Sequence, residues 1–250
     1  MNQTYFWRIL MKNVCFGIFG LGAIILSLVI FPLMHVFIPD IRKRDENMRK
    51  TIHIFFNTFV VLMQFLRLIK VTWNDKASIL PEDSGCIITA NHPSLIDIVI
   101  LISRIPKGDC IVKHNLFQIP FIRGVVSRLY ISNHLEGEVL INACTRSLEA
   151  GNTLIIFPEG TRNQGSGLGE IKRGAAWIAL RSNQKIFPIH IETNDARGLR
   201  KGDGVFTYNK KGPIDYRINV GDYISSHNYG GIRQSQAARK LTNEIAKAIS

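Results

Sequence analysis

The chain has 250 residues, of which 46% are hydrophobic and 20% charged, a balance that excludes disordered, collagen-like and low-complexity proteins. Lysine and arginine number 31 against 19 aspartate and glutamate residues, a formal net charge of +12. A surface of this sign attracts polyanions, and nucleic acid, anionic lipid and phosphorylated substrates all satisfy that condition. The four cysteines lack CxxC spacing, so we expect buried, reduced thiols rather than a zinc or redox site.

The N-terminal part contains an uncharged run of 25 residues, from Val14 to Ile38. As a helix this run would be roughly 37 Å long, against about 30 Å for the hydrocarbon core of a bilayer. Pro32 lies inside the run and is expected to kink or end the helix. Arg8 and Lys12 precede the run, and basic residues follow it. A single membrane span and a hairpin dipping into one leaflet therefore both remain open.

A second apolar segment, from Ile52 to Ile69, follows a cluster of basic residues: Arg42, Lys43, Arg44, Arg49 and Lys50. The polar positions in and beside the segment fall on one narrow helical stripe, formed by Lys50, His53, Asn57, Gln64 and Arg67. This pattern is typical of a helix that lies in the membrane interface or packs against the first helix, and a buried core helix with one wet edge is the alternative. We predict that residues 1–69 form a membrane-anchoring region, with the basic cluster on the cytoplasmic face.

Residues 70–250 show the alternation of short apolar strands and helices that is typical of an α/β domain with helices on both faces of its sheet. The expected strands are Cys86–Ala90, Cys110–Val112, Leu129–Ser132, Leu154–Phe157, Ile186–Ile191 and Tyr216–Val220. The expected helices are Ser94–Ser103, Leu140–Ala150, Gly174–Arg181 and Ser235–Ile249.

The first chemically informative motif runs from Asn91 to Asp97, directly after an expected strand. Ser94 and Asp97 have the spacing of a capping box, which predicts a helix that begins at Ser94. His92 would then lie just outside the helix, where Asp97 can hold one imidazole nitrogen and leave the other free as a base. The alternative is that Asp97 only caps the helix and His92 is a turn residue.

The second motif, Phe157–Arg162, also follows an expected strand. Gly160 permits a tight turn, Thr161 supplies a hydroxyl group, and Arg162 carries a planar fork suited to phosphate. Glu159 beside them is expected to bind hydroxyl groups or to pair with a cation. The alternative is an ordinary turn with a surface ion pair.

Together the motifs resemble those of the lysophospholipid acyltransferase family. The family's HxxxxD motif appears as His92–Asp97, preceded by the usual Asn91, and its FPEGTR motif is complete at Phe157–Arg162. Three further segments fit the family pattern, namely Lys172-Arg173-Gly174, Ile186-Phe187-Pro188-Ile189 and Pro120–Gly124. An arginine expected after the strand at Tyr130–Ser132 is missing, which puts the usual phosphate contact there in doubt.

The resemblance implies a mixed α/β sheet flanked by helices and a membrane-bound O-acyltransferase. His92 would be the base, oriented by Asp97. The acceptor would be bound by Asn91, Glu159, Gly160, Thr161, Arg162 and Lys172. The donor would be acyl-CoA or acyl carrier protein, with no metal or other cofactor. The acceptor would be a lysophospholipid, first of all 1-acylglycerol 3-phosphate, and the expected location is the cytoplasmic face of a bacterial inner membrane.

Two alternatives remain. The missing arginine and the Gln164–Gly169 insertion leave room for another lipid acceptor, such as a lyso-ornithine lipid or an aryl-polyene-type pigment lipid. A catalytically silent membrane scaffold is the other, and the intact His92 and Asp97 weigh against it. A serine hydrolase and a P-loop enzyme are disfavoured because GxSxG and GK[ST] are absent. The aromatic residues do not interleave with basic ones, so a nucleic-acid partner is not expected.

Overall fold

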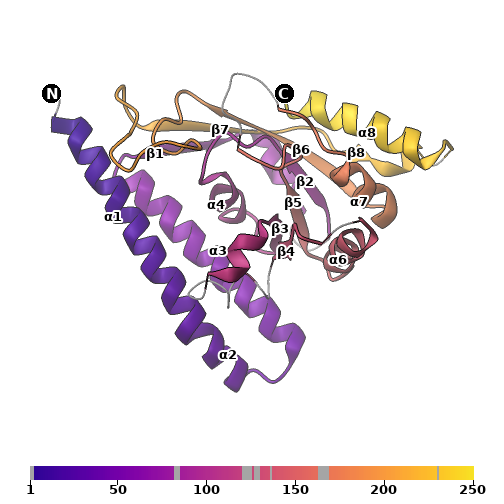
Figure 1. Cartoon of the computed structure of the whole chain (residues 1–250), viewed down its shortest axis with the longest axis horizontal. Helices are drawn as coiled ribbons and strands as arrows, with labels where there is room; N and C mark the ends of the chain where they lie inside the picture. The colour runs from indigo at the N-terminus through magenta and orange to yellow at the C-terminus, as the bar shows by residue number, and fades with distance from the viewer. Residues whose placement is uncertain are drawn as a thin grey trace.

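A computed structural model describes residues 3–81, 85–119, 126, 130–135, 137–162, 169–229 and 231–250 of the chain. The predicted Pro120–Gly124 block, Leu129, and the Gln164–Gly169 insertion except for Gly169 itself lie outside these residues. In the described part, one mixed sheet separates an N-terminal helical hairpin from a group of helices on the opposite face (Figure 1).

The hairpin begins with a continuous helical rod made of α1 (Gln3–Ile25), a π-helical turn (Leu26–Ile30) and α2 (Phe31–Phe37). The helix does not end at Pro32, which was one of the two outcomes expected there. The N–H of Phe31 donates to the carbonyl of Leu26, and this five-residue register lets the helix pass a proline that has no N–H to give. By length and hydropathy, Thr4–Phe37 is the one helix in the described residues suited to cross a membrane.

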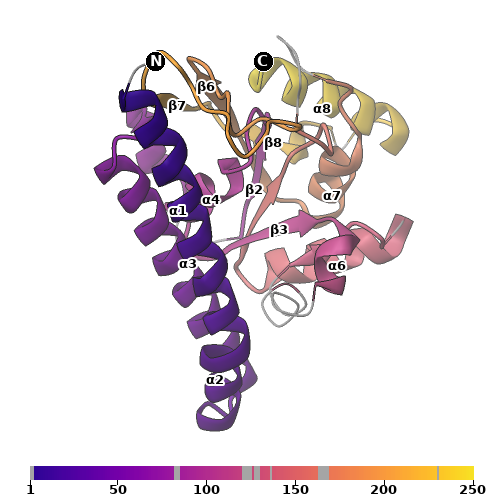
Figure 2. The same ribbon diagram turned by 60° about the vertical axis from the view of Figure 1, so that its left-hand side comes forward.

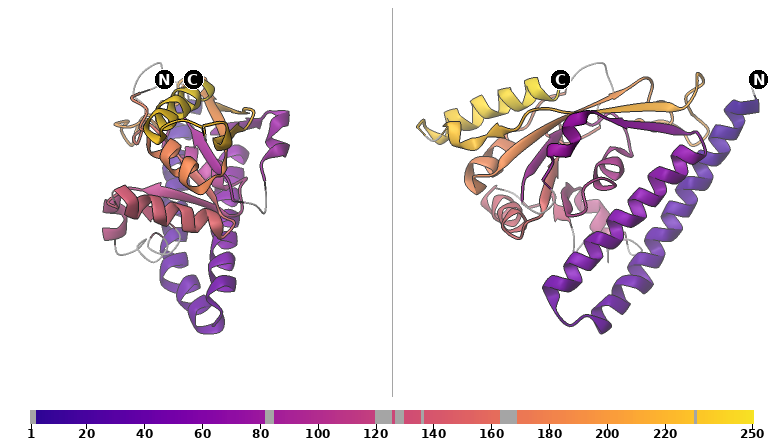
Figure 3. Two further views of the ribbon diagram at one scale, coloured as in Figure 1. Left: turned by 90° about the vertical axis from the view of Figure 1, so that its right-hand side faces the viewer. Right: turned by 180° about the vertical axis from the view of Figure 1, so that it is seen from behind.

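Helix α3 (Ile41–Phe65) runs back beside the first rod (Figure 3). It begins eleven residues earlier than the predicted helix (41 against 52), because Asp40 caps it by accepting from the N–H groups of Arg42 and Lys43. It ends earlier as well, where Arg67 adopts a left-handed φ of 53°. Residues from Ile69 onward form a strand that the sequence reading assigned partly to this helix.

The polar stripe of α3 does not form a wet edge along its whole length. His53 Nδ1 lies 2.8 Å from the carbonyl oxygen of Ile102, and the side-chain oxygen of Gln64 accepts from the N–H of Val71. The opposite faces are buried against α1 and the α/β domain, through Met48, Ile52, Phe59, Val60 and Met63. Helix α3 therefore packs against the first helix and the α/β domain. Beyond its first residue, Ile41, its exposed large apolar residues lie on one flank: Ile54, Val61 and Phe65.

The sheet has the strand order β1-β7-β6-β2-β5-β3-β4, with β8 also paired to β6. The pairs are parallel, apart from the antiparallel contacts of β6 with β7 and β8. The strands are β1 (Ile69–Trp73), β2 (Ile87–Ala90), β3 (Gly108–Val112), β4 (Ile131–Ser132), β5 (Thr153–Ile156), β6 (Lys185–Thr193), β7 (Ile214–Val220) and β8 (Ile224–Ser225). The predicted mixed α/β fold is confirmed.

Helices cover both faces of the sheet. The hairpin and α4 (Asp97–Ile102) pack on one face, and α6 (Gly137–Glu149), α7 (Gly174–Ser182) and α8 (Gln234–Ala248) pack on the other (Figures 1 and 2). Short 3₁₀ helices occupy Asp75–Ile79, His114–Gln118 and Ser226–Tyr229. The division at residue 69 stays a prediction, although residues on both sides of it share one apolar core. All four cysteines are free and buried, as expected.

Candidate active site

His92 and Asp97 meet at the carboxyl end of β2, where a short loop leads into α4. The Nδ1 atom of His92 lies 2.7 Å from Asp97 Oδ2. Asp97 is fully buried, whereas 18% of the His92 side chain is exposed toward a cavity. Because Asp97 engages Nδ1, the Nε2 atom is the nitrogen left to face a substrate.

The predicted start of α4 is wrong by three residues, since the helix begins at Asp97 and not at Ser94. Ser94 instead donates two hydrogen bonds to the Asp97 carboxylate. Its backbone N–H donates to Asp97 Oδ2 over 2.7 Å, and its hydroxyl group donates to Asp97 Oδ1. With the imidazole, three donors hold the carboxylate in place.

Tyr216 is a member of the site that the sequence did not reveal. It lies on β7, fully buried, and its hydroxyl group donates to Ser94 Oγ over 2.9 Å. Burial and, second, the negative charge of Asp97 raise the pKa of Tyr216 well above its ordinary value, so the phenol stays protonated and remains a donor. The resulting chain of hydrogen bonds runs from Tyr216 through Ser94 and Asp97 to His92.

We expect Tyr216→Phe to lower kcat severalfold, with little change in KM, because the Ser94 hydroxyl loses the donor that fixes its orientation. Tyr208→Phe is the matched control. Tyr208 is equally buried and donates to the carbonyl of Leu68, away from the dyad. Each change removes one buried hydrogen bond, worth about 1 kcal/mol of stability. Steady-state kinetics and thermal unfolding of both variants check this, and equal kcat losses would contradict it.

The Phe157–Arg162 segment follows β5, the parallel neighbour of β2, so it lies beside the dyad. The Phe157 ring stacks on His92 with centroids 4.1 Å apart and an interplanar angle of 18°. Gly160 has a φ of +67°, and a Cβ atom there would lie 3.0 Å from the Nζ atom of Lys172. Glycine therefore allows both the left-handed turn and the close approach of a cation.

Two of the predicted substrate-binding residues are engaged in holding loops together. The Glu159 carboxylate accepts from the N–H groups of His92 and Gly169, each over 3.0 Å, and only 6% of the residue is exposed. The Asn91 side chain forms a pair of bonds with the backbone of Ile191 on β6. These contacts join the two motifs and the sheet. A direct role of either residue in substrate binding stays a prediction.

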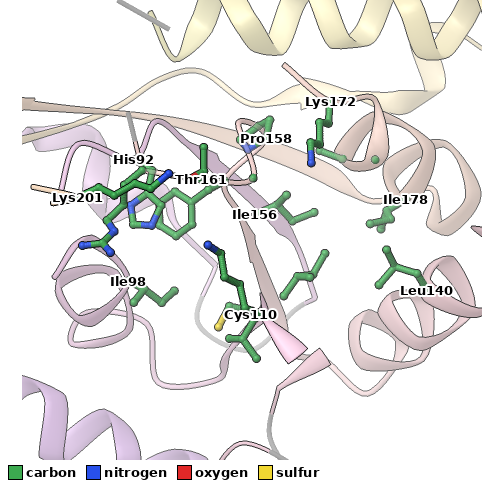
Figure 4. A pocket seen from close by; sticks show the side chains of 18 of the residues that line it. His92, Ile98, Cys110, Leu140, Ile156, Pro158, Thr161, Lys172, Ile178 and Lys201 are labelled. Carbon is green, nitrogen blue, oxygen red and sulfur yellow. Dashed lines mark hydrogen bonds between the residues drawn. The ribbon is translucent and has the colours of Figure 1, made fainter. Parts of the chain in front are cut away.

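A cavity of about 500 Å³ opens in front of His92. Five predicted site residues line it: His92, Gly160, Thr161, Arg162 and Lys172. His92 and Lys201 lie at one side, and apolar residues of α6 and α7, Leu140 and Ile178, lie at the other (Figure 4). The site thus combines a base, a cationic rim and an apolar wall.

Lys113 and Lys201 are cavity residues that the sequence reading missed. Lys113 follows β3, so its position at the carboxyl end of a parallel strand was a usable signal. Lys201 comes from the β6–β7 connection, and its Nζ atom donates to the hydroxyl group of Thr161 over 3.3 Å. Lys201 and Thr161 are 40 residues apart, so no local sequence pattern connects them.

A second cavity, of about 390 Å³, lies between the hairpin and α4. Its walls are almost entirely apolar, with Phe16, Phe19, Phe55 and Phe59 on the hairpin side. Four residues line both cavities, so the two adjoin: Leu95, Ile98, Cys110 and Val112. The apolar chamber therefore lies directly beside the cavity that contains His92.

No group of three His, Cys, Asp or Glu side chains in the described residues is placed to hold a metal ion. The expectation that the reaction needs no metal or cofactor stays a prediction.

Comparisons with known proteins agree with this architecture. A family model described as Acyltransferase matches residues 69–192. A protein from Borreliella burgdorferi named 1-acyl-sn-glycerol-3-phosphate acyltransferase is 28% identical over 174 residues, covering 65% of this chain and 68% of that protein. A protein of the same name from Helicobacter pylori is 37% identical over 118 residues, covering 43% and 48%.

A crystal structure of the 1-acyl-sn-glycerophosphate (LPA) acyltransferase from Thermotoga maritima is similar over 96% of this chain and 95% of that chain, with a TM-score of 0.70 and 21% identity. That likeness shows a shared fold, hairpin included. The family match and the curated relatives give the class: residues 69–192 belong to the acyltransferase family, and the protein is an acyltransferase. The predicted family is confirmed.

Proposed function

We propose that the protein transfers a fatty acyl group from acyl-CoA or acyl carrier protein to the free hydroxyl group of 1-acylglycerol 3-phosphate, giving phosphatidic acid. The observation that carries the proposal is the position of His92. Its free nitrogen faces a cavity that has a cationic rim and adjoins an apolar chamber. The names of the curated relatives support the same acceptor.

In the proposed mechanism, His92 Nε2 takes the proton of the acceptor hydroxyl group as its oxygen attacks the thioester carbonyl carbon. The new C–O bond forms, the C–S bond breaks, and the imidazolium returns the proton to the departing thiolate. Asp97 stabilises the imidazolium and fixes its tautomer. The thioester is already activated, so the mechanism needs no acyl-enzyme.

The rim of the cavity supplies the charge for a phosphate group. Four cationic side chains line it: Lys113, Arg162, Lys172 and Lys201. Lys113 and Lys201 provide positive charge in the absence of the arginine missing from the segment around Ser132. This favours a phosphorylated acceptor over the lyso-ornithine and pigment-lipid alternatives. The adjoining apolar chamber suits an acyl chain.

The exposed surface of the first rod supports a membrane location. Trp7, Val14, Ile18, Leu21, Ile25 and Leu28 recur at spacings of three, four or seven residues and form one exposed apolar row. α3 and the N-terminal half of α1 both contact the α/β domain, through Arg49 with Asp109 and Lys12 with Val205. These contacts favour a hairpin lying in one leaflet over a separate membrane span. The donor is cytoplasmic, so we place the active site at the cytoplasmic surface.

A substrate panel tests the proposal. Purified protein is incubated with acyl-CoA or acyl carrier protein and with 1-acylglycerol 3-phosphate, lyso-ornithine lipid or monoacylglycerol, and the products are identified by mass spectrometry. Phosphatidic acid as the main product is the expected result. A preference for lyso-ornithine lipid or monoacylglycerol would refute the acceptor assignment.

Arg162→Lys should raise the KM for 1-acylglycerol 3-phosphate by about tenfold while leaving the donor KM nearly unchanged. Lysine keeps the charge but loses the bidentate fork that matches a phosphate group. Arg239→Lys, at an exposed position of α8, is the control and should change neither constant. Equal effects of Arg162→Lys on both KM values, or none, would remove Arg162 from the acceptor site.

A further inference from the structure

The connection between β6 and β7 contains a loop, residues 198–209, whose backbone is firmly held at its base. Gly198 has a φ of +95°, and a Cβ atom there would lie 2.5 Å from the carbonyl oxygen of Thr207. The Asp203 carboxylate accepts from the N–H groups of Gly198 and Arg200, at 2.6 and 2.9 Å. Tyr208 closes the loop as a fully buried side chain. The tip of the loop is therefore presented in a defined position.

The tip of this loop consists of Val205 and Phe206, which are 63% and 82% exposed. A single exposed apolar residue is ordinary on a protein surface. Two adjacent ones on a tightly built loop, next to a further exposed apolar surface, indicate a contact with something apolar.

The tip is fastened to the N-terminal half of α1. Lys12 Nζ donates to the carbonyl oxygens of Val205 and Thr207, at 2.7 and 3.0 Å, and Asn13 Nδ2 donates to that of Val205. Asn13 follows Phe6 and Leu10 at spacings of seven and three residues, so the three share one side of the helix. Phe6 and Leu10 are about half exposed. The loop thus lies beside the N-terminal half of α1 (Figure 2), at the flank of the exposed apolar row of that helix.

Charge around the loop has one dominant sign. The β6–β7 connection, residues 194–213, contains five basic residues (Arg197, Arg200, Lys201, Lys210 and Lys211) and two acidic ones, Asp195 and Asp203. Asp195 is paired with Arg200 at 2.8 Å, and Asp203 is used in the loop base. Lys210 and Lys211 are exposed. Such a surface is complementary to anionic lipid headgroups.

We propose that the 198–209 loop is a second membrane-contacting element, which inserts Val205 and Phe206 at the boundary between headgroups and acyl chains while its basic neighbours contact lipid phosphates. The inference rests on the proposed membrane location. It adds a point of attachment beside the apolar row of α1, and a row together with a point beside it fixes the orientation of the molecule. Lys201 of the same loop contacts Thr161 of the active site, so docking of the loop brings the mouth of the cavity to the headgroup layer.

A fluorescent label at the tip tests insertion. In full-length Phe206→Cys, an environment-sensitive dye reacts at position 206, because the four native thiols are buried. Vesicles of phosphatidylcholine and phosphatidylglycerol should shift its emission to the blue, and nitroxide quenchers on the acyl chains should quench it. Asn243→Cys, at an exposed position of α8, should respond to neither.

The outcomes of this experiment separate the two proposals. A label at position 206 that stays water-exposed on vesicle-bound protein would refute the loop proposal and leave the membrane location standing. A label that responds only to added acyl carrier protein would also refute the loop proposal and leave the membrane location standing. The loop would then be a docking surface for the donor. Protein that fails to bind the vesicles at all would refute both proposals.

A functional comparison uses acceptors in two physical states. Val205→Ser with Phe206→Ser should lower activity about fivefold on 1-acylglycerol 3-phosphate in vesicles, and by less than about twofold on a short-chain, water-soluble form. Val139→Ser, at an exposed apolar position of α6, is the matched control and should change neither. In the wild type, phosphatidylglycerol should raise the vesicle activity, and Lys210→Gln with Lys211→Gln should weaken that rise. Equal losses on both acceptor forms would overturn the loop's role.

Discussion

His92→Ala is expected to lower kcat for acyl transfer by about 10²- to 10⁴-fold, the range that a positioned general base contributes. The imidazole is held by Asp97 at 2.7 Å and stacked on Phe157, so its orientation depends on few other groups. Alanine removes the nitrogen to which the mechanism assigns the acceptor's proton. Single-turnover kinetics with purified acyl-CoA and 1-acylglycerol 3-phosphate measure the loss.

Two further variants make this result specific. His227→Ala changes an exposed histidine outside the catalytic cavity and should leave kcat unchanged. Asp97→Asn should lose most of the activity, because an amide favours the wrong imidazole tautomer. Circular dichroism should show His92→Ala folded, since His92 lies outside the helices and strands, and it also checks the folding of the other two variants. Near-normal turnover by folded His92→Ala would show that another group is the base.

The parts of the site that the sequence could predict are those whose members are close along the chain. His92 and Asp97 are five residues apart, and the second motif is contiguous, so local spacing suggested each pairing and the resemblance to the family favoured it over a simple capping role. Tyr216 contacts Ser94 across 122 residues, a pairing that depends on the order of strands in the sheet. That order cannot be derived from apolar patterns, because each buried strand has the same kind of neighbour on either side.

The N-terminal hairpin shows how an apolar pattern can mislead. The uniform apolar surface of the second segment is equally suited to lipid and to a protein core. Its polar stripe indicated a wet edge, yet His53 and Gln64 bond backbone groups of the α/β domain. The strand at Ile69–Trp73 was missed for a related reason. It follows the helix without a glycine or proline to mark the change, and its partner β7 lies about 145 residues further along the chain (Ile69 pairs with Ile214).

The hairpin is joined to the α/β domain by a buried ion pair as well as by the shared apolar core. Arg49 on α3 donates to both carboxylate oxygens of Asp109 on β3, at 2.8 and 3.2 Å. The side chains of Arg49 and Asp109 are 14% and 3% exposed. Ser147 of α6 also donates to the carboxylate. One carboxylate thus connects three elements that are far apart in sequence.

Arg49→Met should lower the free energy of unfolding by about 3–5 kcal/mol, because it leaves the buried Asp109 carboxylate without its cation. Lys50→Met is the matched control, since it makes the same chemical change at an exposed neighbour, and should cost less than about 0.5 kcal/mol. Arg49→Met combined with Asp109→Asn should recover part of the loss, since the stranded charge is then gone. Denaturant unfolding in detergent micelles measures all three. Equal costs for Arg49→Met and Lys50→Met would mean that the hairpin is only loosely attached. The expected result would instead mean that α3 belongs to the catalytic unit, so that removing residues 1–69 would unfold the enzyme rather than release it from the membrane.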